Sequence, residues 1–292
     1  DHYRTSVHPL YSLITNPIIF ILKKVGLEEE KAVKLFISTI ASLWLVLFYL
    51  ILRLLNLRKI DAFQFTLLAS VSSSVLFWGA VPETFMLGSL SILVVTAFTI
   101  VSNKNIFNYR WFVLISATSM VATITNWMAG IIATAVNFDL RRCIRISFDA
   151  LIVVTLFSAI QHILYPSSEF FLFFGGETKY LMVEEAGTWI DKLRVFFFNS
   201  IIMPEILMSD NILSPKWPAL SIQLSKLGSV LDLRSILNII WASVFCLGSY
   251  ALVKWNENKK AKMFFLLVLA GQLVLHILYG DETFLYSLHW VP

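Results

Sequence analysis

The stretch Lys31–Asn56 reads KAVKLFISTIASLWLVLFYLILRLLN and is apolar on all sides over several helical turns. About 20 apolar residues in a helix cross the roughly 30 Å of hydrocarbon in a bilayer. A helix that is hydrophobic all round lies in a membrane or deep inside a large core. We therefore interpret this stretch as a membrane-spanning helix.

Further apolar blocks recur along the chain. Lipid-exposed backbone must satisfy its own hydrogen bonds, so each block is expected to be helical, and the blocks are too uniformly apolar for barrel strands, which alternate. The whole composition agrees, because 58% of residues are hydrophobic and only 14% are charged, against about 25% in soluble domains. The blocks are Ala32–Leu57, Ala62–Val81, Phe85–Val101, Trp111–Asn137, Ile146–Leu164, Ile236–Lys254 and Lys262–Tyr279.

These features predict an all-α fold: a polytopic transmembrane helical bundle forming one domain over residues 1–292. The chain opens on Asp1 without an initiator methionine and stops on Pro292. We interpret both ends as cuts within a larger protein. The two cysteines, Cys143 and Cys246, do not suit a disulfide or a metal site.

The charges of the short turns predict the topology. One set of turns is basic, and by the positive-inside rule it is cytoplasmic. The opposite turns are acidic or mixed and are expected outside, as is a juxtamembrane helix within His8–Lys24 that Asn16-Pro17 either kinks or bounds. The basic residues are Arg53, Arg58, Lys59, Lys104, Arg110, Arg141, Arg142, Arg145, Lys254, Lys259, Lys260 and Lys262.

Two segments need separate treatment. Trp111–Asn137 has basic residues at both ends, which one crossing does not allow, so we predict a re-entrant-type hairpin of two short helices broken at Thr125-Asn126-Trp127. A polar turn at membrane depth must be shielded by protein. Residues 165–235 are predicted to be a long external loop. Its WIDKLRVFFFNSII segment is interpreted as an interfacial helix, with Phe196–Phe198 toward lipid and Asp191, Lys192 and Arg194 toward water.

After this folding, five polar clusters lie on the external face. We interpret them as parts of one site, although polar loops are also ordinary in membrane proteins. The clusters are Asp1–Arg4 with His8-Pro9, Val81–Thr84, Thr125–Trp127, Gly175–Tyr180 and Gly280–Trp290.

An aspartate in the first external loop, followed by His8-Pro9 and a juxtamembrane helix, resembles the GT-C superfamily of membrane glycosyltransferases. These include relatives of protein mannosyltransferases and aminoarabinose transferases. The closing GDETFLYSLHW of Gly280–Trp290 looks like external-loop motifs of bacterial GT-C-like proteins. The chain departs from that pattern in lacking the first and the C-terminal transmembrane helices. It also has His2 after Asp1 where many members have Asp-Glu.

The resemblance implies an inverting glycosyltransferase that moves a sugar from a polyprenyl-phosphate donor to a glycan, lipid or protein acceptor. The implied location is the plasma (inner) membrane, with the active face periplasmic or extracellular. Membrane lipids are expected partners and nucleic acids are not. Such a reaction needs a carboxylate to accept the proton of the acceptor hydroxyl. It also needs cations for the leaving phosphate and an apolar groove for the lipid chain.

On this hypothesis Asp1 is the candidate catalytic base, by its loop position, and Glu83 is the second carboxylate. Glu83 also suits the start of the next helix, where negative charge is favourable, and Thr84 is a candidate cap. Arg4 is the first candidate for the phosphate, because a guanidinium offers a bidentate fork. Lys179 follows it.

The remaining candidates for substrate binding each have a simpler structural role. Asn126 suits a turn, His8, Tyr286 and His289 suit interfacial anchors, and Asp281 and Glu282 form an acidic pair in a loop. No cofactor is expected. His2, His8 and His289 with Asp1 allow a divalent cation, but their spacing does not require one.

Two other classes of protein stay open. A transporter or flippase of a lipid-linked or small polar substrate would carry polar groups near the bilayer midplane, at broken helices related by repeats. The blocks are nearly free of charge there, and no repeat is visible. A structural subunit would explain polar loops without needing Asp1, His2 and Arg4 together.

Overall fold

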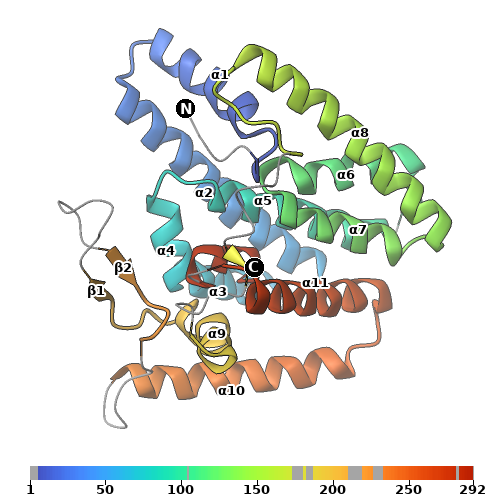
Figure 1. Cartoon of the computed structure of the whole chain (residues 1–292). Coiled ribbons are helices and arrows are strands. Elements are labelled where there is room, and N and C mark those ends of the chain that lie inside the picture. The colour runs from blue at the N-terminus through green and yellow to red at the C-terminus, as the bar shows by residue number, and fades with distance from the viewer. Residues whose placement is uncertain are drawn as a thin grey trace.

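The computed structural model describes residues 6–103, 105–172, 180–181, 187–209, 219–225, 233–280 and 283–291. Within them the regular structure is almost entirely helical (Figure 1). The one sheet among these residues is an antiparallel pair of three-residue strands, β1 (Leu207–Ser209) and β2 (Ala219–Ser221). The prediction of an all-α helical architecture is confirmed.

Five described helices are long and apolar enough to cross a membrane, which makes the chain a multi-pass membrane protein. They are α2 (Glu29–Leu54), α5 (Phe85–Ser102), α8 (Leu140–Leu164), α10 (Leu233–Lys254) and α11 (Lys259–Leu278).

A sixth candidate span is broken. The apolar block Ala62–Val81 forms α3 (Lys59–Ser70) and α4 (Ser73–Ala80), which meet at an angle of 66°. The break has a local cause, because the Ser72 hydroxyl accepts a hydrogen bond from Val75 N at 3.4 Å and caps the new helix. Short polar residues of this kind compete with the helical backbone for hydrogen bonds.

The predicted hairpin is present. Helix α6 (Tyr109–Ala122) ends at Thr123, a short 3-10 turn η1 (Ile124–Asn126) follows, and α7 (Trp127–Ala135) returns along α6. The helices pack so closely that a Cβ at Gly130 would lie 2.7 Å from the Cα of Ser116. The tip is buried by other parts of the chain, as expected for a polar turn: Ile124 N donates to the Val7 carbonyl at 3.0 Å, and Leu10 N donates to that of Val121 at 3.1 Å.

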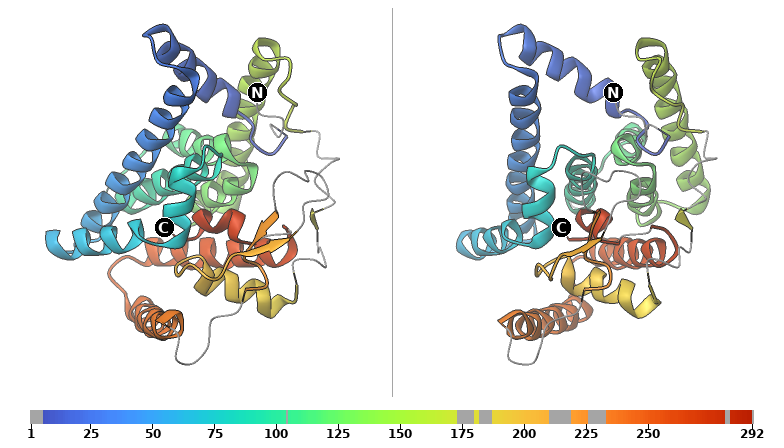
Figure 2. Two further views of the ribbon diagram at one scale, coloured as in Figure 1. Left: turned by 90° about the vertical axis from the view of Figure 1, so that its left-hand side faces the viewer. Right: turned by 60° about the vertical axis from the view of Figure 1, so that its left-hand side comes forward.

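The juxtamembrane helix is α1 (Tyr11–Lys24), and Pro17 lies inside it, so Asn16-Pro17 does not bound it. Figure 2 shows α1 crossing the top of the bundle, from near the end of α8 to the start of α2. Its first turn is fixed to α8 because the Gln161 amide donates to the Pro9 carbonyl at 3.0 Å and accepts from Leu13 N at 2.9 Å.

The prediction for the interfacial helix is wrong in its orientation. The segment forms α9 (Trp189–Arg194) and a π-helical turn η4 (Val195–Asn199). Phe196 is buried and stacks on Trp290 at 4.2 Å between ring centroids. Lys192 is also buried and donates to the Ile277 carbonyl at 2.8 Å, whereas Trp189 is exposed. An amphipathic pattern does not distinguish lipid from protein as the partner of its apolar face.

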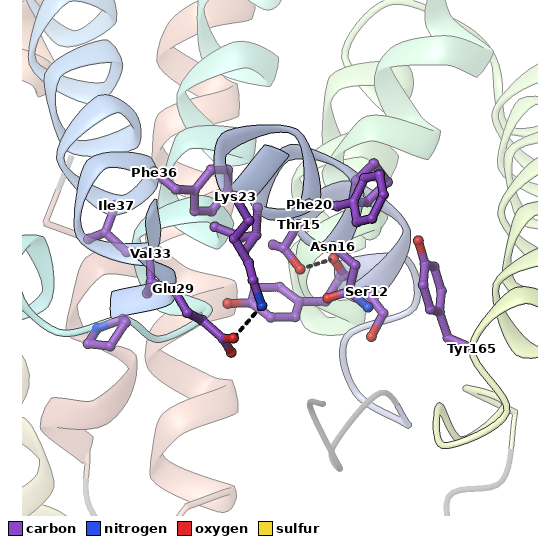
Figure 3. Close-up of a pocket in the computed structure, with 14 residues that line it drawn as sticks. Ser12, Thr15, Asn16, Phe20, Lys23, Glu29, Val33, Phe36, Ile37 and Tyr165 are labelled. Carbon is purple, nitrogen blue, oxygen red and sulfur yellow. Dashed lines mark hydrogen bonds and ion pairs between the residues drawn. The ribbon is translucent and has the colours of Figure 1, made fainter. Parts of the chain in front are cut away.

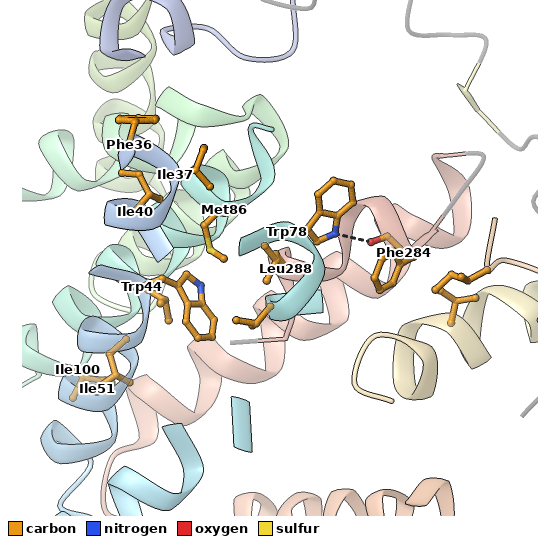
Figure 4. Packing of buried hydrophobic residues seen from close by; sticks show 14 of the residues in the cluster. Phe36, Ile37, Ile40, Trp44, Ile51, Trp78, Met86, Ile100, Phe284 and Leu288 are labelled. Atoms are coloured by element: carbon orange, nitrogen blue, oxygen red, sulfur yellow. Dashed lines mark hydrogen bonds between the residues drawn. The ribbon is translucent and has the colours of Figure 1, made fainter. Parts of the chain in front are cut away.

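The main core joins α2, α4 and α5 to the end of the chain (Figure 4). Residues Thr283–His289 form a 3-10 helix, η5, that packs against α5, α4 and η4. The Trp44 indole donates to Ser89 Oγ at 2.7 Å, and that hydroxyl donates to the Leu288 carbonyl at 2.6 Å. The chain end therefore lies inside the bundle, as part of its core.

Two of the basic turns lie together. Lys260, at the start of α11, donates from Nζ to Asn137 Oδ1 in the turn between α7 and α8, at 3.0 Å. Both turns belong to the set that the positive-inside rule places in the cytoplasm. Their common end agrees with that topology, and which face of the membrane it occupies stays a prediction.

Candidate functional site

A cavity of about 660 Å³ lies beneath α1 (Figure 3). We call it the chamber. Helix α1 contributes one wall, the first turns of α2 a second, and Pro82 and Tyr165 close it from the turn before α5 and the end of α8. Its lining combines aromatic rings such as Tyr11 and Tyr165 with polar side chains such as Asn16.

An ion pair bridges the chamber between α1 and α2. Lys23 Nζ lies 2.5 Å from Glu29 Oε2, and both side chains line the cavity (Figure 3). Both are substantially exposed, with side-chain exposures of 46% and 70%. Exposed pairs of this kind contribute little to stability because water and salt screen them. Each partner is therefore available to a ligand that enters the chamber.

Glu83 acts on the chamber electrostatically. Burial of Tyr11 raises the pKa of its phenol to about 12, and the negative charge of Glu83 adds to that effect. Glu83 itself is exposed and follows Pro82, which lines the chamber. The carboxylate of Glu83 is therefore close enough to the Tyr11 phenol in the chamber wall to act on it, from a different element.

His8 forms hydrogen bonds that connect three parts of the chain near Glu83. Its Nδ1–H donates to the Ala122 carbonyl at 2.7 Å, and Thr123 Oγ1 lies 3.3 Å from the same nitrogen. The Thr84 hydroxyl donates to Nε2 at 3.2 Å. Thr84, expected to cap α5, makes no side-chain capping bond there and uses its hydroxyl for His8. His8 therefore joins the segment before α1 to the start of α5 and to the tip of the hairpin.

Gly88 lies at the centre of a second group of polar atoms. A Cβ at this position would be 3.1 Å from His289 Nε2, 3.2 Å from Thr123 Oγ1 and 3.3 Å from Asn126 Nδ2. The Asn126 amide donates to the Gly88 carbonyl at 2.9 Å. The glycine leaves room for three polar side chains, from the hairpin and from η5, to approach α5 closely.

Histidines and aromatic rings continue this group into α11. His276 stacks on Tyr286 with 4.8 Å between centroids and lies 6.2 Å from the ring of His289. Its Nε2–H donates to Gln272 Oε1 at 3.1 Å. Tyr286 also contacts Phe85 at 5.8 Å, so the chain end reaches the start of α5, two residues beyond Glu83.

The structure brings four of the described candidates together around the start of α5, but neither they nor Glu83 are among the residues that line the chamber. Glu83 lies beside the chamber, and His8, Asn126, Tyr286 and His289 gather beneath it around the start of α5. Their roles in substrate binding stay predictions. The other candidates, Asp1, Arg4, Lys179, Asp281 and Glu282, lie outside the described residues.

Several residues of this region were not predicted from the sequence. Tyr11 and Lys23 belong to α1, for which the sequence predicted a juxtamembrane helix but no role for these two side chains. Gln272 and His276 are buried in α11 at a spacing of four residues, which puts both on one face of the helix. Polar and ionisable residues inside a span are functional candidates by default. The four-residue spacing of Gln272 and His276 within an apolar block is the sequence pattern that points to them.

Within the described ranges, no group of three or more histidine, cysteine, aspartate or glutamate side chains is placed to hold a metal ion. His8, one of the residues considered for a cation, uses both ring nitrogens within the protein.

No family model, curated protein or solved structure matches this chain. Its class is therefore defined by its own architecture: a multi-pass helical membrane protein with a cavity beneath a helix that crosses the bundle.

Proposed function

We propose that this protein is an inverting glycosyltransferase of the GT-C type, which transfers a sugar from a polyprenyl-phosphate donor to an acceptor on the non-cytoplasmic side of the membrane. The observation that carries the proposal is the chamber. It lies beneath α1, next to an acidic turn and among membrane-spanning helices. A donor of this kind needs a polar reaction site directly beside lipid.

The chemistry assigns separate roles to the acidic and basic groups. Asp1 accepts the proton of the acceptor hydroxyl, and Glu83 is the second carboxylate at the chamber. Arg4 and Lys179 neutralise the phosphate that leaves with the lipid. Lys23, which already faces the chamber, is a third cation for the phosphate once it separates from Glu29. The acceptor is a glycan, a lipid or a protein.

The remaining described candidates, His8, Asn126, Tyr286 and His289, do not line the chamber. His8 and Asn126 fix the hairpin against α5 below the chamber. The rings of Tyr286 and His289 lie 6.2 Å apart between centroids.

One observation favours the alternative of a transporter or flippase. Gln272, His276, His289 and Asn126 form a buried polar group within the bundle, although the blocks are nearly free of charge near the midplane. Polar residues inside spans mark substrate and ion pathways in transporters. A flippase moves the lipid-linked sugar without breaking its bond to phosphate, so the two functions are separable by experiment.

Donor turnover tests the proposal. The protein is reconstituted in lipid with a panel of polyprenyl-phosphate sugars, and cleavage of the donor is followed. Asp1→Asn and Glu83→Gln are expected to abolish or strongly reduce turnover, by about 100-fold or more, because they remove candidates for proton transfer. Protein level and folding should be retained.

Asp61→Asn is the matched control, because Asp61 pairs with Arg58 at 2.7 Å in a turn of the basic set. It should turn over donor at the wild-type rate. Movement of intact donor across the bilayer without cleavage would replace the transferase by the flippase.

A further inference from the structure

A second cavity lies between α10 and the rest of the bundle. It has a volume of about 230 Å³, and its walls come from α2, α5, α10, α11 and the end of the chain. The lining is apolar apart from two side chains, Thr96 and His289. None of its lining residues is shared with the chamber.

The walls place this cavity at the level of the membrane. α2, α5, α10 and α11 are all candidate spans, and α10 is the least buried of the five. Leu252 is the residue through which α10 reaches the cavity, whereas Leu247 on the same helix is 70% exposed. The space beside α10 is therefore bordered by lipid hydrocarbon, and its natural occupant is a lipid chain.

His289 supplies the polar end of the cavity. Its side chain is only 1% exposed, and neither ring nitrogen has a hydrogen-bond partner within the described parts of the chain. Asn126 Oδ1 is likewise buried without a partner there, and the Asn126 amide and His289 approach the same point above Gly88. Buried polar atoms in folded proteins are nearly always paired, so this group calls for a ligand.

The state of His289 restricts the chemistry of that ligand. Burial lowers the pKa of the imidazole to about 4, so the ring is neutral at pH 7. A neutral imidazole presents one donor and one acceptor. A hydroxyl can pair with either nitrogen, since it accepts from the N–H or donates to the bare nitrogen, whereas a charged head group would be buried without a counter-ion, which is costly.

We propose that this cavity binds an uncharged lipid with a single long chain and a terminal hydroxyl, the chain lying between α10 and α11 and the hydroxyl bonded to His289. The site shares no lining residue with the chamber, although His289 is also a candidate for substrate binding there, and its test measures lipid binding and not donor turnover. Polyprenols and fatty alcohols share the required chemistry.

Photolabelling tests the site. The full chain in phosphatidylcholine nanodiscs is exposed to a long-chain fatty alcohol that carries a diazirine on its chain, and labelled residues are mapped by mass spectrometry. Matched probes are the fatty acid and the alkane of equal length. The alcohol should label Ile92–Thr96 and Phe264–Leu269 saturably and be displaced by unlabelled alcohol.

Two substitutions and one control sharpen the result. Leu252→Trp fills the cavity from α10 and should abolish the saturable label, whereas Leu247→Trp on the exposed face should leave it unchanged. His289→Phe should weaken alcohol binding by about tenfold, toward that of the alkane, because it removes the hydrogen-bonding partner. Size-exclusion profiles verify that each variant is folded.

Equal, unsaturable labelling by the alcohol and the alkane would show annular lipid only and overturn the proposal. Saturable labelling that is unaffected by Leu252→Trp would also overturn it, because the probe would then bind elsewhere. Stronger labelling by the fatty acid than by the alcohol would contradict the assignment of an uncharged head group.

Discussion

The pKa of the Tyr11 phenol responds to the burial and the charges around the chamber. The phenol is partly buried in the wall of the chamber, and the raised pKa follows from that burial and from the nearby negative charge of Glu83. An ionised phenolate there would be desolvated and would face a carboxylate, and both effects favour the neutral form.

This gives a prediction at alkaline pH. Because the folded-state pKa of Tyr11 is about 12, above its usual value of 10.0, its contribution to stability is complete below pH 10 and is lost as pH rises toward 12. Glu83→Gln removes the negative charge and should lower the pKa of Tyr11. The measurement is phenolate absorbance of the protein in detergent, with the Tyr11→Phe titration subtracted.

Glu257→Gln, in the turn between α10 and α11, is the control and should leave the Tyr11 titration unchanged. A Tyr11 that titrates at its ordinary value in the folded protein, or one that does not respond to Glu83→Gln, would separate Glu83 from the chamber.

Residues beside spans were easier to predict than residues within them. His8, Asn126 and His289 stand in short polar segments at the ends of apolar blocks, so the sequence points to them, and they do gather around the start of α5. His276 lies within an apolar span, where one histidine scarcely changes the mean hydropathy. Its contact with Tyr286 depends on the return of the chain end into the bundle, which no local pattern encodes.

The hairpin of α6 and α7 is the element whose packing is most sensitive to one methyl group. A Cβ at Gly130 would lie 2.4 Å from Ser119 Oγ and 2.7 Å from Ser116 Cα. Since a backbone atom is one of the two, Gly130→Ala requires the helices to move apart. We expect a loss of about 1–3 kcal/mol, the usual range for overpacking, seen as a lower midpoint of thermal unfolding in detergent.

Gly248→Ala in α10 is the matched substitution, since among the described residues nothing beyond the neighbouring backbone of its own helix lies within 4 Å of its Cβ position. Alanine has the higher helix propensity, by about 1 kcal/mol, so this variant should be at least as stable as the wild type. Equal destabilisation by the two substitutions would contradict the close packing of the hairpin.

Prediction at the scale of elements succeeded where length or charge decides the outcome. The spans follow from their length, and the hairpin break follows from basic residues at both ends of one block. The bend between α3 and α4 was missed, because a capping serine is a local signal inside an otherwise continuous apolar block. The orientation of α9 and η4 was wrong because Phe196 packs against Trp290, from the far end of the chain.

At the scale of the whole molecule, one surface contacts lipid and another, the chamber, is open to a ligand. Apolar side chains are exposed along the candidate spans and face lipid, whereas the chamber opens beneath α1 at the opposite end of α2 from Arg53. The sequence predicts this separation through its charged turns. It does not predict the chamber, whose walls come from α1, α2, Pro82 and Tyr165.

The central claim is that the chamber is the site of the reaction and faces the non-cytoplasmic side. A single cysteine at its lining tests both parts: Asn16→Cys in a background of Cys143→Ser and Cys246→Ser. The measurement is labelling by a membrane-impermeant maleimide in sealed vesicles of known orientation, with and without the polyprenyl-phosphate sugar. Asn105→Cys, in the exposed turn between α5 and α6, reports the opposite side.

We predict that Asn16→Cys is labelled only from the non-cytoplasmic side, that the donor protects it, and that the labelled protein no longer turns over donor. Asn105→Cys should be labelled only from the other side. Labelling of both cysteines from one side, or full turnover by protein labelled at position 16, would contradict the account.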